Sequence, residues 1–178
     1  MLTHDHNFTW TVISQATVFA PEKQEGICTI CGAKKTRDNG NKLTATIKLN
    51  ATSIKLQKKQ STTKVKVTGL ANGDSVKSWI SSNKKIVTVD KSGKIKAGKK
   101  TGNAKITVTL KSGKKAILKV KVQSTKVKTT KITGLKTNFT LKKGKSLTLK
   151  PVVAPITSQE KVTYTTSNKK IATVTKNG

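Results

Sequence analysis

One segment of this chain occurs twice, 85 residues apart, and this repeat constrains the fold more than any other feature of the sequence. Residues 79–93 read WISSNKKIVTVDKSG and residues 164–178 read YTTSNKKIATVTKNG, with SNKKI identical in both. Self-similarity at a fixed period is typical of tandem units that contain the same secondary-structure elements. The fold of the first copy therefore predicts the fold of the second.

Residues 43–123 alternate apolar and polar side chains, which is the pattern of half-buried antiparallel strands. Val, Ile and Leu alternate with Lys or Thr in TATIKLN, SIKLQ, TKVKVTGL, VKSWI, IVTVD, KIKAG, AKITVTLK and AILKVKVQ. Turn signals separate these segments, and Gly93 and Gly113 stand where a tight hairpin needs positive φ. No stretch has helical periodicity. About seven short strands with one tryptophan predict an immunoglobulin-like β-sandwich, with Trp79 packed between the two sheets.

Residues 124–178 repeat only the first part of this pattern. Phe139 and Leu141 take the places of Ile54 and Leu56, and Tyr164 takes the place of Trp79. Counterparts of residues 94–122 do not follow, so we expect a second, incomplete copy whose core is open on one side. An uncovered sheet edge pairs readily with another chain, which makes self-association through this copy an expected interaction.

Residues 1–42 differ from the rest and are predicted to form a separate small module. They contain both histidines, both cysteines and four of the seven acidic residues. A chain of about 40 residues buries little apolar area and usually needs a metal or a disulfide to fold.

The cysteines and histidines of this module fit a structural zinc site. A Cys-x-x-Cys-Gly turn presents two thiolates to one ion, and tetrahedral zinc needs two further ligands. Residues two apart on a strand share a face, so His-x-His could supply both. The predicted ligands of this zinc-ribbon-like module are Cys28, Cys31, His4 and His6, with Asp5 or water as a replacement for one histidine. One alternative is a disulfide between the two cysteines, which is favoured outside the cell. The other is a redox pair, but the βαβ context expected of such a motif is absent.

The formal net charge is +30, from 37 basic and seven acidic residues, and Arg37 is the only arginine. Lysines that alternate with Val and Ile coat the strand faces and protect sheet edges from pairing. They also attract polyanions such as wall teichoic acid, acidic glycans, phospholipid headgroups or DNA. Without arginine forks or interleaved aromatic residues, specific recognition of nucleic acid is not expected.

Catalysis has few candidate residues. The sandwich region holds only Asp74, Asp90 and Glu160, each in or beside a predicted turn, and no Ser-His-Asp set can be assembled there. The chain is therefore expected not to be an enzyme. No apolar run approaches the roughly 18 residues of a transmembrane helix. The N-terminal residues do not resemble a secretory signal, so we expect the signal and anchor of a secreted protein to lie outside this sequence.

The order of motifs in residues 53–122 closely resembles the bacterial immunoglobulin-like domain, group 2. The motifs are W-x-S-S-N, then I-V-T-V-D-x-x-G-K-I, then A-G-x-x-x-G-x-A-x-I-T-V, then a V-x-V strand. The second copy resembles the first half of such a domain. This resemblance implies an extracellular repeat, as in adhesins of the invasin and intimin type and in surface proteins of Gram-positive gut bacteria. The N-terminal segment is similar to small Cys-x-x-Cys-Gly modules beside such repeats in clostridial surface proteins.

The sequence thus predicts a non-catalytic stalk or adhesion region of a bacterial cell-surface or secreted protein, whose lysines face acidic polymers or glycans of a cell wall or host. One alternative is a carbohydrate-binding accessory module of a larger secreted enzyme. That alternative needs an exposed aromatic platform, for which Trp10, Trp79 and Tyr164 are the candidates. A further alternative is a basic, zinc-containing nucleic-acid-binding protein.

Overall fold

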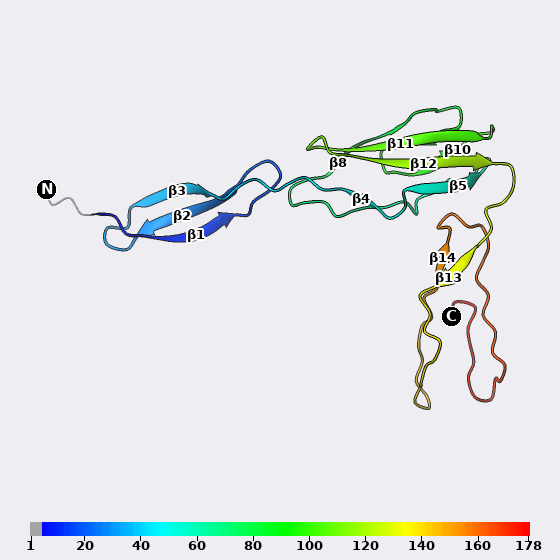
Figure 1. Ribbon diagram of the computed structural model, residues 1–178. Helices are drawn as coiled ribbons and strands as arrows, with labels where there is room; N and C mark the ends of the chain where they lie inside the picture. The colour runs from blue at the N-terminus through cyan, green and yellow to red at the C-terminus, as the bar shows by residue number, and fades with distance from the viewer. Residues whose placement is uncertain (1–4) are drawn as a thin grey trace.

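The computed structural model describes residues 5–178, and within them it contains strands and turns but no helix. Figure 1 shows three successive parts: an N-terminal sheet, a sandwich, and a C-terminal part that bends away from the end of the sandwich. The predicted all-β fold is confirmed.

The N-terminal part is a single antiparallel sheet in the order β1-β2-β3. Its strands are β1 (Phe8–Ser14), β2 (Glu22–Cys28) and β3 (Lys34–Asn39). The indole of Trp10 lies flat on the sheet, because its strand partner Gly26 has no side chain to displace it. Arg37 covers the other side of the ring, with its Cζ 3.9 Å from the centroid. The ring of Phe8 lies 5.6 Å from that of Trp10, so these two aromatic residues share one face of the sheet.

The sandwich begins after residue 43 and has a four-stranded and a three-stranded sheet. The four-stranded sheet has the order β5-β12-β11-β8, and the three-stranded sheet has the order β6-β10-β9. Strands β5 and β12 pair in parallel and the other pairs are antiparallel. The bounds are β4 (Lys48–Leu49), β5 (Ser53–Gln57), β6 (Ser61–Thr62), β7 (Val67–Thr68), β8 (Val76–Ser81), β9 (Val87–Val89), β10 (Ile95–Ala97), β11 (Gly102–Leu110) and β12 (Lys115–Gln123), with β4 paired to β7.

The core lies between these two sheets and is built from the apolar half of the alternating pattern. Along β11 and β12 every second residue is buried while the lysines between them are exposed. Burying one such aliphatic side chain contributes about 1.5 to 3 kcal/mol. The fully buried aliphatic residues of the cluster are Leu56, Val87, Ile95, Ile106, Leu118, Val120 and Val122. The period-two pattern therefore predicted the buried face correctly.

Trp79 lies at the border of this core and not at its centre. It is on β8, the edge strand of the four-stranded sheet, and only part of it is buried. Its ring packs over Gly93, where an added Cβ would be 2.9 Å from Cζ2 of the indole. The two ends of the repeated segment thus contact each other.

The C-terminal part contains one two-stranded sheet of β13 (Lys131–Thr133) and β14 (Val152–Ala154). Residues that are core in the first copy are exposed in the second, since no strands equivalent to β11 and β12 cover them within residues 126–178. Phe139 and Leu141 are 47% and 51% exposed, whereas Ile54 and Leu56 are 3% and 0% exposed. These apolar side chains are therefore uncovered within residues 126–178.

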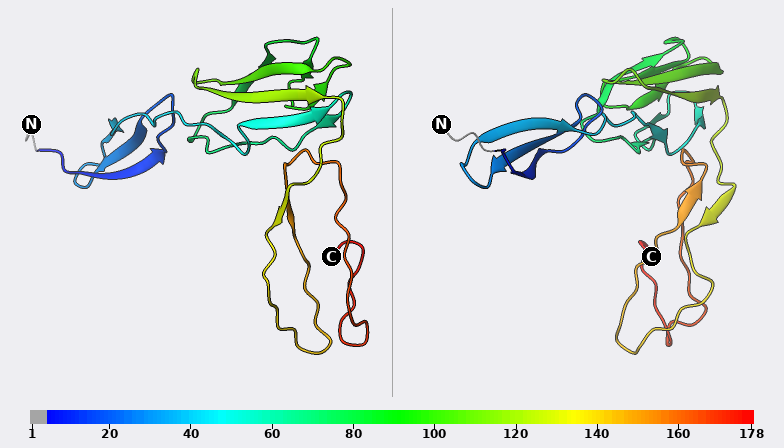
Figure 2. Two further views of the ribbon diagram at one scale, coloured as in Figure 1. Left: turned by 45° about the vertical axis from the view of Figure 1, so that its right-hand side comes forward. Right: turned by 60° about the vertical axis from the view of Figure 1, so that its left-hand side comes forward.

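Both junctions of the sandwich are held by hydrogen bonds. At one end, Val18 N donates to Asn72 O at 3.1 Å. At the other, the buried Thr157 donates from Oγ1 to the Lys55 carbonyl at 2.6 Å, and Gln159 Nε2 donates to Gln57 Oε1 at 3.0 Å. Two rotated views show the same bend between sandwich and C-terminal part (Figure 2). The turn after β14 therefore docks on the edge of β5.

Candidate metal centre and lysine surface

The Cys-x-x-Cys turn connects β2 to β3. Gly32 N donates to Cys28 O at 2.9 Å, and Cys28 N donates to Ala33 O at 2.9 Å, which closes the turn beneath the two sulfurs. Thr29 N donates to Asn7 O at 3.0 Å and ties the residues that precede β1 to the same turn. The chain before β1 is thereby held against the cysteines.

This arrangement brings His6 to both sulfurs. Its Nδ1 lies 3.5 Å from Cys28 Sγ and 3.4 Å from Cys31 Sγ. The ligand atoms of all three residues lie within 4.8 Å of one another. Cys28 is buried, whereas Cys31 and His6 are exposed, so the cluster opens to solvent on one side.

The spacing of these atoms fits a tetrahedral ion. Zinc binds sulfur at about 2.3 Å and nitrogen at about 2.0–2.1 Å, so the sulfur-to-nitrogen edge of a tetrahedral site is about 3.6 Å. The two observed edges are 3.5 and 3.4 Å. Two thiolates and one imidazole are also the donor types that zinc prefers. The three described residues therefore fit zinc in both chemistry and spacing.

Two other predicted members of this site are not placed in it. His4, the proposed fourth ligand, lies outside the described residues. Asp5, the proposed replacement, is exposed and is not one of the residues grouped around the two sulfurs.

The three aromatic candidates for a carbohydrate platform are each partly covered. Trp10 lies between Gly26 and Arg37, and Trp79 lies on Gly93. Tyr164 lies on Gly178, whose added Cβ would be 2.8 Å from Cζ of the phenol. None of these rings has both faces exposed, so they give little support to the carbohydrate alternative, which needs an exposed aromatic platform.

The three carboxylates of the repeats accept hydrogen bonds from backbone and hydroxyl groups. Asp90 Oδ1 accepts from Ser92 Oγ at 2.7 Å and from the backbone N of Ser92 and Lys94. These hydrogen bonds hold the pKa of Asp90 below its ordinary value despite some desolvation, and the bond from the Ser92 hydroxyl contributes most. Backbone and side-chain hydrogen bonds from Thr129 likewise lower the pKa of Glu160.

For Asp74, desolvation raises the pKa. Hydrogen bonds from the Ser112 hydroxyl and neighbouring backbone groups together lower the pKa by more, so the net shift is downward. Lowered pKa values keep all three carboxylates ionised at neutral pH, which suits hydrogen-bond acceptors and not proton donors.

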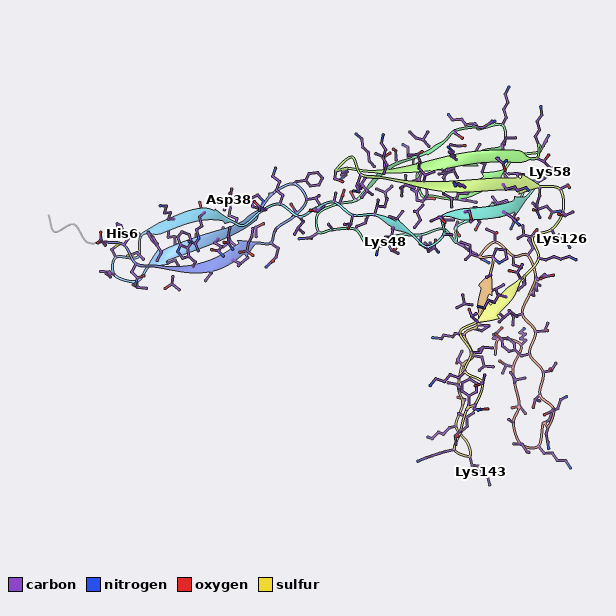
Figure 3. All side chains as sticks on the ribbon, in the orientation of Figure 1. His6, Asp38, Lys48, Lys58, Lys126 and Lys143 are labelled. Atoms are coloured by element: carbon purple, nitrogen blue, oxygen red, sulfur yellow. The ribbon has the colours of Figure 1, made fainter. Side chains whose placement is uncertain are left out.

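The charge of the chain lies almost entirely in the two repeats. Residues 43–178 contain 32 lysines and three acidic residues, whereas residues 1–42 contain five basic and four acidic residues. The one ion pair among residues 5–178 joins Lys34 to Glu25 in the N-terminal sheet. Figure 3 shows labelled lysines from the sandwich, at Lys48, to the tip of the C-terminal part, at Lys143. No lysine of the two repeats forms an ion pair there.

Four lysines line a cleft of about 740 Å³ on the outer face of the four-stranded sheet. They are Lys55, Lys105, Lys119 and Lys121. The alternating pattern predicts that such lysines are exposed, but not that they meet. The β11–β12 hairpin brings Lys105 to Lys119. Lys55 joins them through the parallel pairing of β5 with β12, which no local signal in the sequence indicates.

The profile of the bacterial Ig-like domain (group 2) matches residues 43–120 and 126–178. The chain belongs to this family. Both repeats are therefore group 2 Ig-like domains or parts of them, and the N-terminal sheet lies outside the match. Domains of this family occur in bacterial surface proteins and are generally non-catalytic.

A search of curated proteins finds no match to the chain. Within residues 5–178, no helix is long and apolar enough to span a membrane.

Proposed function

We propose that this chain is a non-catalytic stalk or adhesion region of an extracellular or cell-surface protein, and that its lysine coat draws it to acidic polymers of a cell wall or host surface. The observation behind this proposal is the charge of the two Ig-like repeats: 32 lysines, three acidic residues and no ion pair within them. Because every ammonium group remains available, the repeats attract any extended polyanion over several ångströms.

Binding of the full chain to dextran sulfate, with dextran as the uncharged control, tests this function. We expect binding to dextran sulfate that weakens steeply between 50 and 200 mM salt, on the order of 10³-fold for six or more neutralised charges. Equal binding to both polymers, or binding that salt does not weaken, would contradict the proposal.

The N-terminal sheet has a different role in this proposal, that of a small module stapled by zinc. His6, Cys28 and Cys31 would hold the ion, with His4 as the predicted fourth ligand, and the ion would supply a cross-link between the start of β1 and the β2–β3 turn. The support is the agreement of the two sulfur-to-nitrogen distances with a tetrahedral edge.

Metal analysis of the purified chain tests the zinc site. We expect one zinc per chain, and its loss in both Cys28→Ser and Cys31→Ser. The second variant is the control for folding, because Cys31 is exposed whereas Cys28 is buried. A chain without zinc, in which mass spectrometry finds Cys28 bonded to Cys31, would show the disulfide instead.

A further inference from the structure

The cleft on the outer face of the four-stranded sheet brings four lysines together. In the sheet, Lys105 is directly opposite Lys119, and Lys121 is directly beside Lys55. Like charges at directly paired positions destabilise a sheet. Two such pairs stand next to each other, and no Asp or Glu is among the described residues that line the cleft. An anion in the cleft would offset the repulsion between these lysines.

The walls of the cleft come from both Ig-like repeats. Pro155 and Thr130 of the C-terminal part line it together with strands β5, β11 and β12 of the sandwich. The hydrogen bond from Thr157 to the Lys55 carbonyl fixes this corner. Ser53, Ser82 and Asn103 add hydroxyl and amide groups to the lining. The cleft therefore offers ammonium groups and neutral donors side by side.

The spacing of the lysines favours one kind of anion. Lys119 and Lys121 are two residues apart on β12, and an extended strand advances about 6.8 Å over two residues, which is six backbone bonds. A chain of glycerol phosphates also has six backbone bonds per repeat, so its phosphates recur at about 7 Å when it is extended. A phosphate chain that runs along β12 would thus meet a lysine at each repeat, with Lys105 and Lys55 flanking it.

The composition of the cleft disfavours nucleic acid, which has the same six-bond repeat. Binding of single strands relies on aromatic side chains on which bases stack. No aromatic residue is among the described residues that line the cleft. Lysine ammoniums also act as point charges without the planar fork that reads bases.

We propose that this cleft is a binding site for a linear polyol phosphate polymer, held by Lys55, Lys105, Lys119 and Lys121. The inference rests on the proposed attraction of the lysine coat to polyanions and adds a defined site to it. It differs from a diffuse coat in one respect: four particular lysines contribute more than any other four.

The test compares two variants of the full chain with equal charge. In the cleft variant, Lys55, Lys105, Lys119 and Lys121 are all replaced by Gln. In the control variant, the exposed turn residues Lys84, Lys91, Lys100 and Lys114 are replaced by Gln. The probes are a poly(glycerol phosphate) oligomer of about eight repeats, hyaluronate and an oligo-dT strand, measured by calorimetry at several salt concentrations. Thermal unfolding without ligand is measured for each protein.

For the polyol phosphate we expect the cleft variant to bind at least ten-fold more weakly than the unmodified chain, and the control variant less than three-fold more weakly. The slope of log K against the logarithm of the salt concentration should become shallower by about 3 in the cleft variant, because each lost lysine–phosphate contact removes about 0.7 from the slope. The cleft variant should also unfold at a higher temperature without ligand, because two like-charge pairs are removed.

Equal weakening in both variants would overturn the cleft site while leaving the lysine coat intact. Absence of binding by the unmodified chain at low salt would overturn both the cleft site and the proposed function. Tighter binding of oligo-dT or hyaluronate through the same four lysines would overturn the assignment to polyol phosphate.

Discussion

At the scale of single residues, three aromatic rings of this chain each lie against a glycine. Trp10 lies on Gly26, Trp79 lies on Gly93 and Tyr164 lies on Gly178, with an added Cβ 2.8 or 2.9 Å from the nearest ring atom. The second and third pairs occupy the same positions of the repeat. A side chain on the glycine would displace the ring. In the sandwich, the contact of Trp79 with Gly93 links the β9–β10 turn to β8.

Gly93→Ala is expected to destabilise the sandwich more than Gly113→Ala. Both glycines have positive φ, at 82° and 88°, which costs a residue with a Cβ about 1 to 2 kcal/mol. Only Gly93 has a ring in the way, since nothing lies within 4 Å of a Cβ added at Gly113. Chemical denaturation measures both free energies of unfolding. Equal losses would show that the contact with Trp79 contributes nothing.

The carboxylate of Asp90 predicts a dependence of stability on pH. Its pKa is lowered in the folded chain, mainly by the Ser92 hydroxyl and the Lys94 N–H, from an ordinary value of 3.8. The stabilisation is therefore present above about pH 4 and is lost as the pH falls through the lower, folded value. In Asp90→Asn, the amide oxygen can accept the same bonds without titrating, so the loss of stability in acid should be smaller. Denaturation of both proteins at pH 6 and pH 3 measures how much free energy of unfolding each loses in acid. An equal loss in Asp90→Asn and the unmodified chain would contradict the prediction.

At the scale of elements, the N-terminal sheet is one layer without a second sheet to cover it. Trp10 is in this sheet and Trp79 is in the sandwich, and they are the two tryptophans of the chain. Each therefore reports on one element when the other is replaced by Phe.

Removal of metal should unfold the N-terminal sheet but leave the sandwich folded. In Trp79→Phe, we expect a chelator to shift the emission of Trp10 to longer wavelength, because the cross-link between β1 and the β2–β3 turn is lost. In Trp10→Phe, the emission of Trp79 should not change. A response in both variants, or in neither, would show that the metal does not stabilise this sheet in particular.

One buried hydroxyl takes part in the docking of the turn after β14 on β5, beside the hydrogen bond from Gln159 to Gln57. Thr157 is 1% exposed and donates to the Lys55 carbonyl. Thr157→Val keeps the shape of the side chain and leaves that carbonyl without this partner, which costs about 1 to 3 kcal/mol. We expect a larger radius of gyration by small-angle X-ray scattering, because the bend loosens. Thr165→Val serves as the control, because Thr165 is exposed. Equal scattering curves for Thr157→Val and the unmodified chain would contradict the expectation.

At the scale of the whole molecule, exposed apolar residues gather in the C-terminal part. Ile132, Phe139, Leu141 and Val152 are each between 47% and 55% exposed, and Ile171 is 84% exposed. The equivalents of Phe139, Leu141 and Ile171 in the first repeat, Ile54, Leu56 and Ile86, belong to the buried core. Uncovered apolar surface of this kind is available to a second chain or to a further segment that supplies such strands.

The chain is therefore expected to self-associate in a concentration-dependent manner. Sedimentation velocity from 5 to 200 μM should show a growing fraction of dimer, and Phe139→Ser with Leu141→Ser should shift the chain to monomer. The high positive charge opposes association, so the dimer fraction should rise with salt. A monomer at all concentrations and salt levels would contradict this prediction.

The sequence by itself determined the fold class, the alternating buried face and the family, because these depend on local periodicity and on a repeat visible in one dimension. It also placed two cysteines three residues apart, which a turn brings together without help from the rest of the chain. His6 could be proposed because it and His4 are the two histidines of the chain and lie in the same small module as the cysteines.

Only the tertiary structure decided that Lys55 joins the lysines of the β11–β12 hairpin, because β5 and β12 are adjacent and parallel although they are more than 60 residues apart in the chain. The same holds for the place of Trp79 at the border of the core, which follows from the edge position of β8. Long-range strand order depends on the summed packing of the whole sandwich, and alternation of residue types along one strand carries no information about its neighbour.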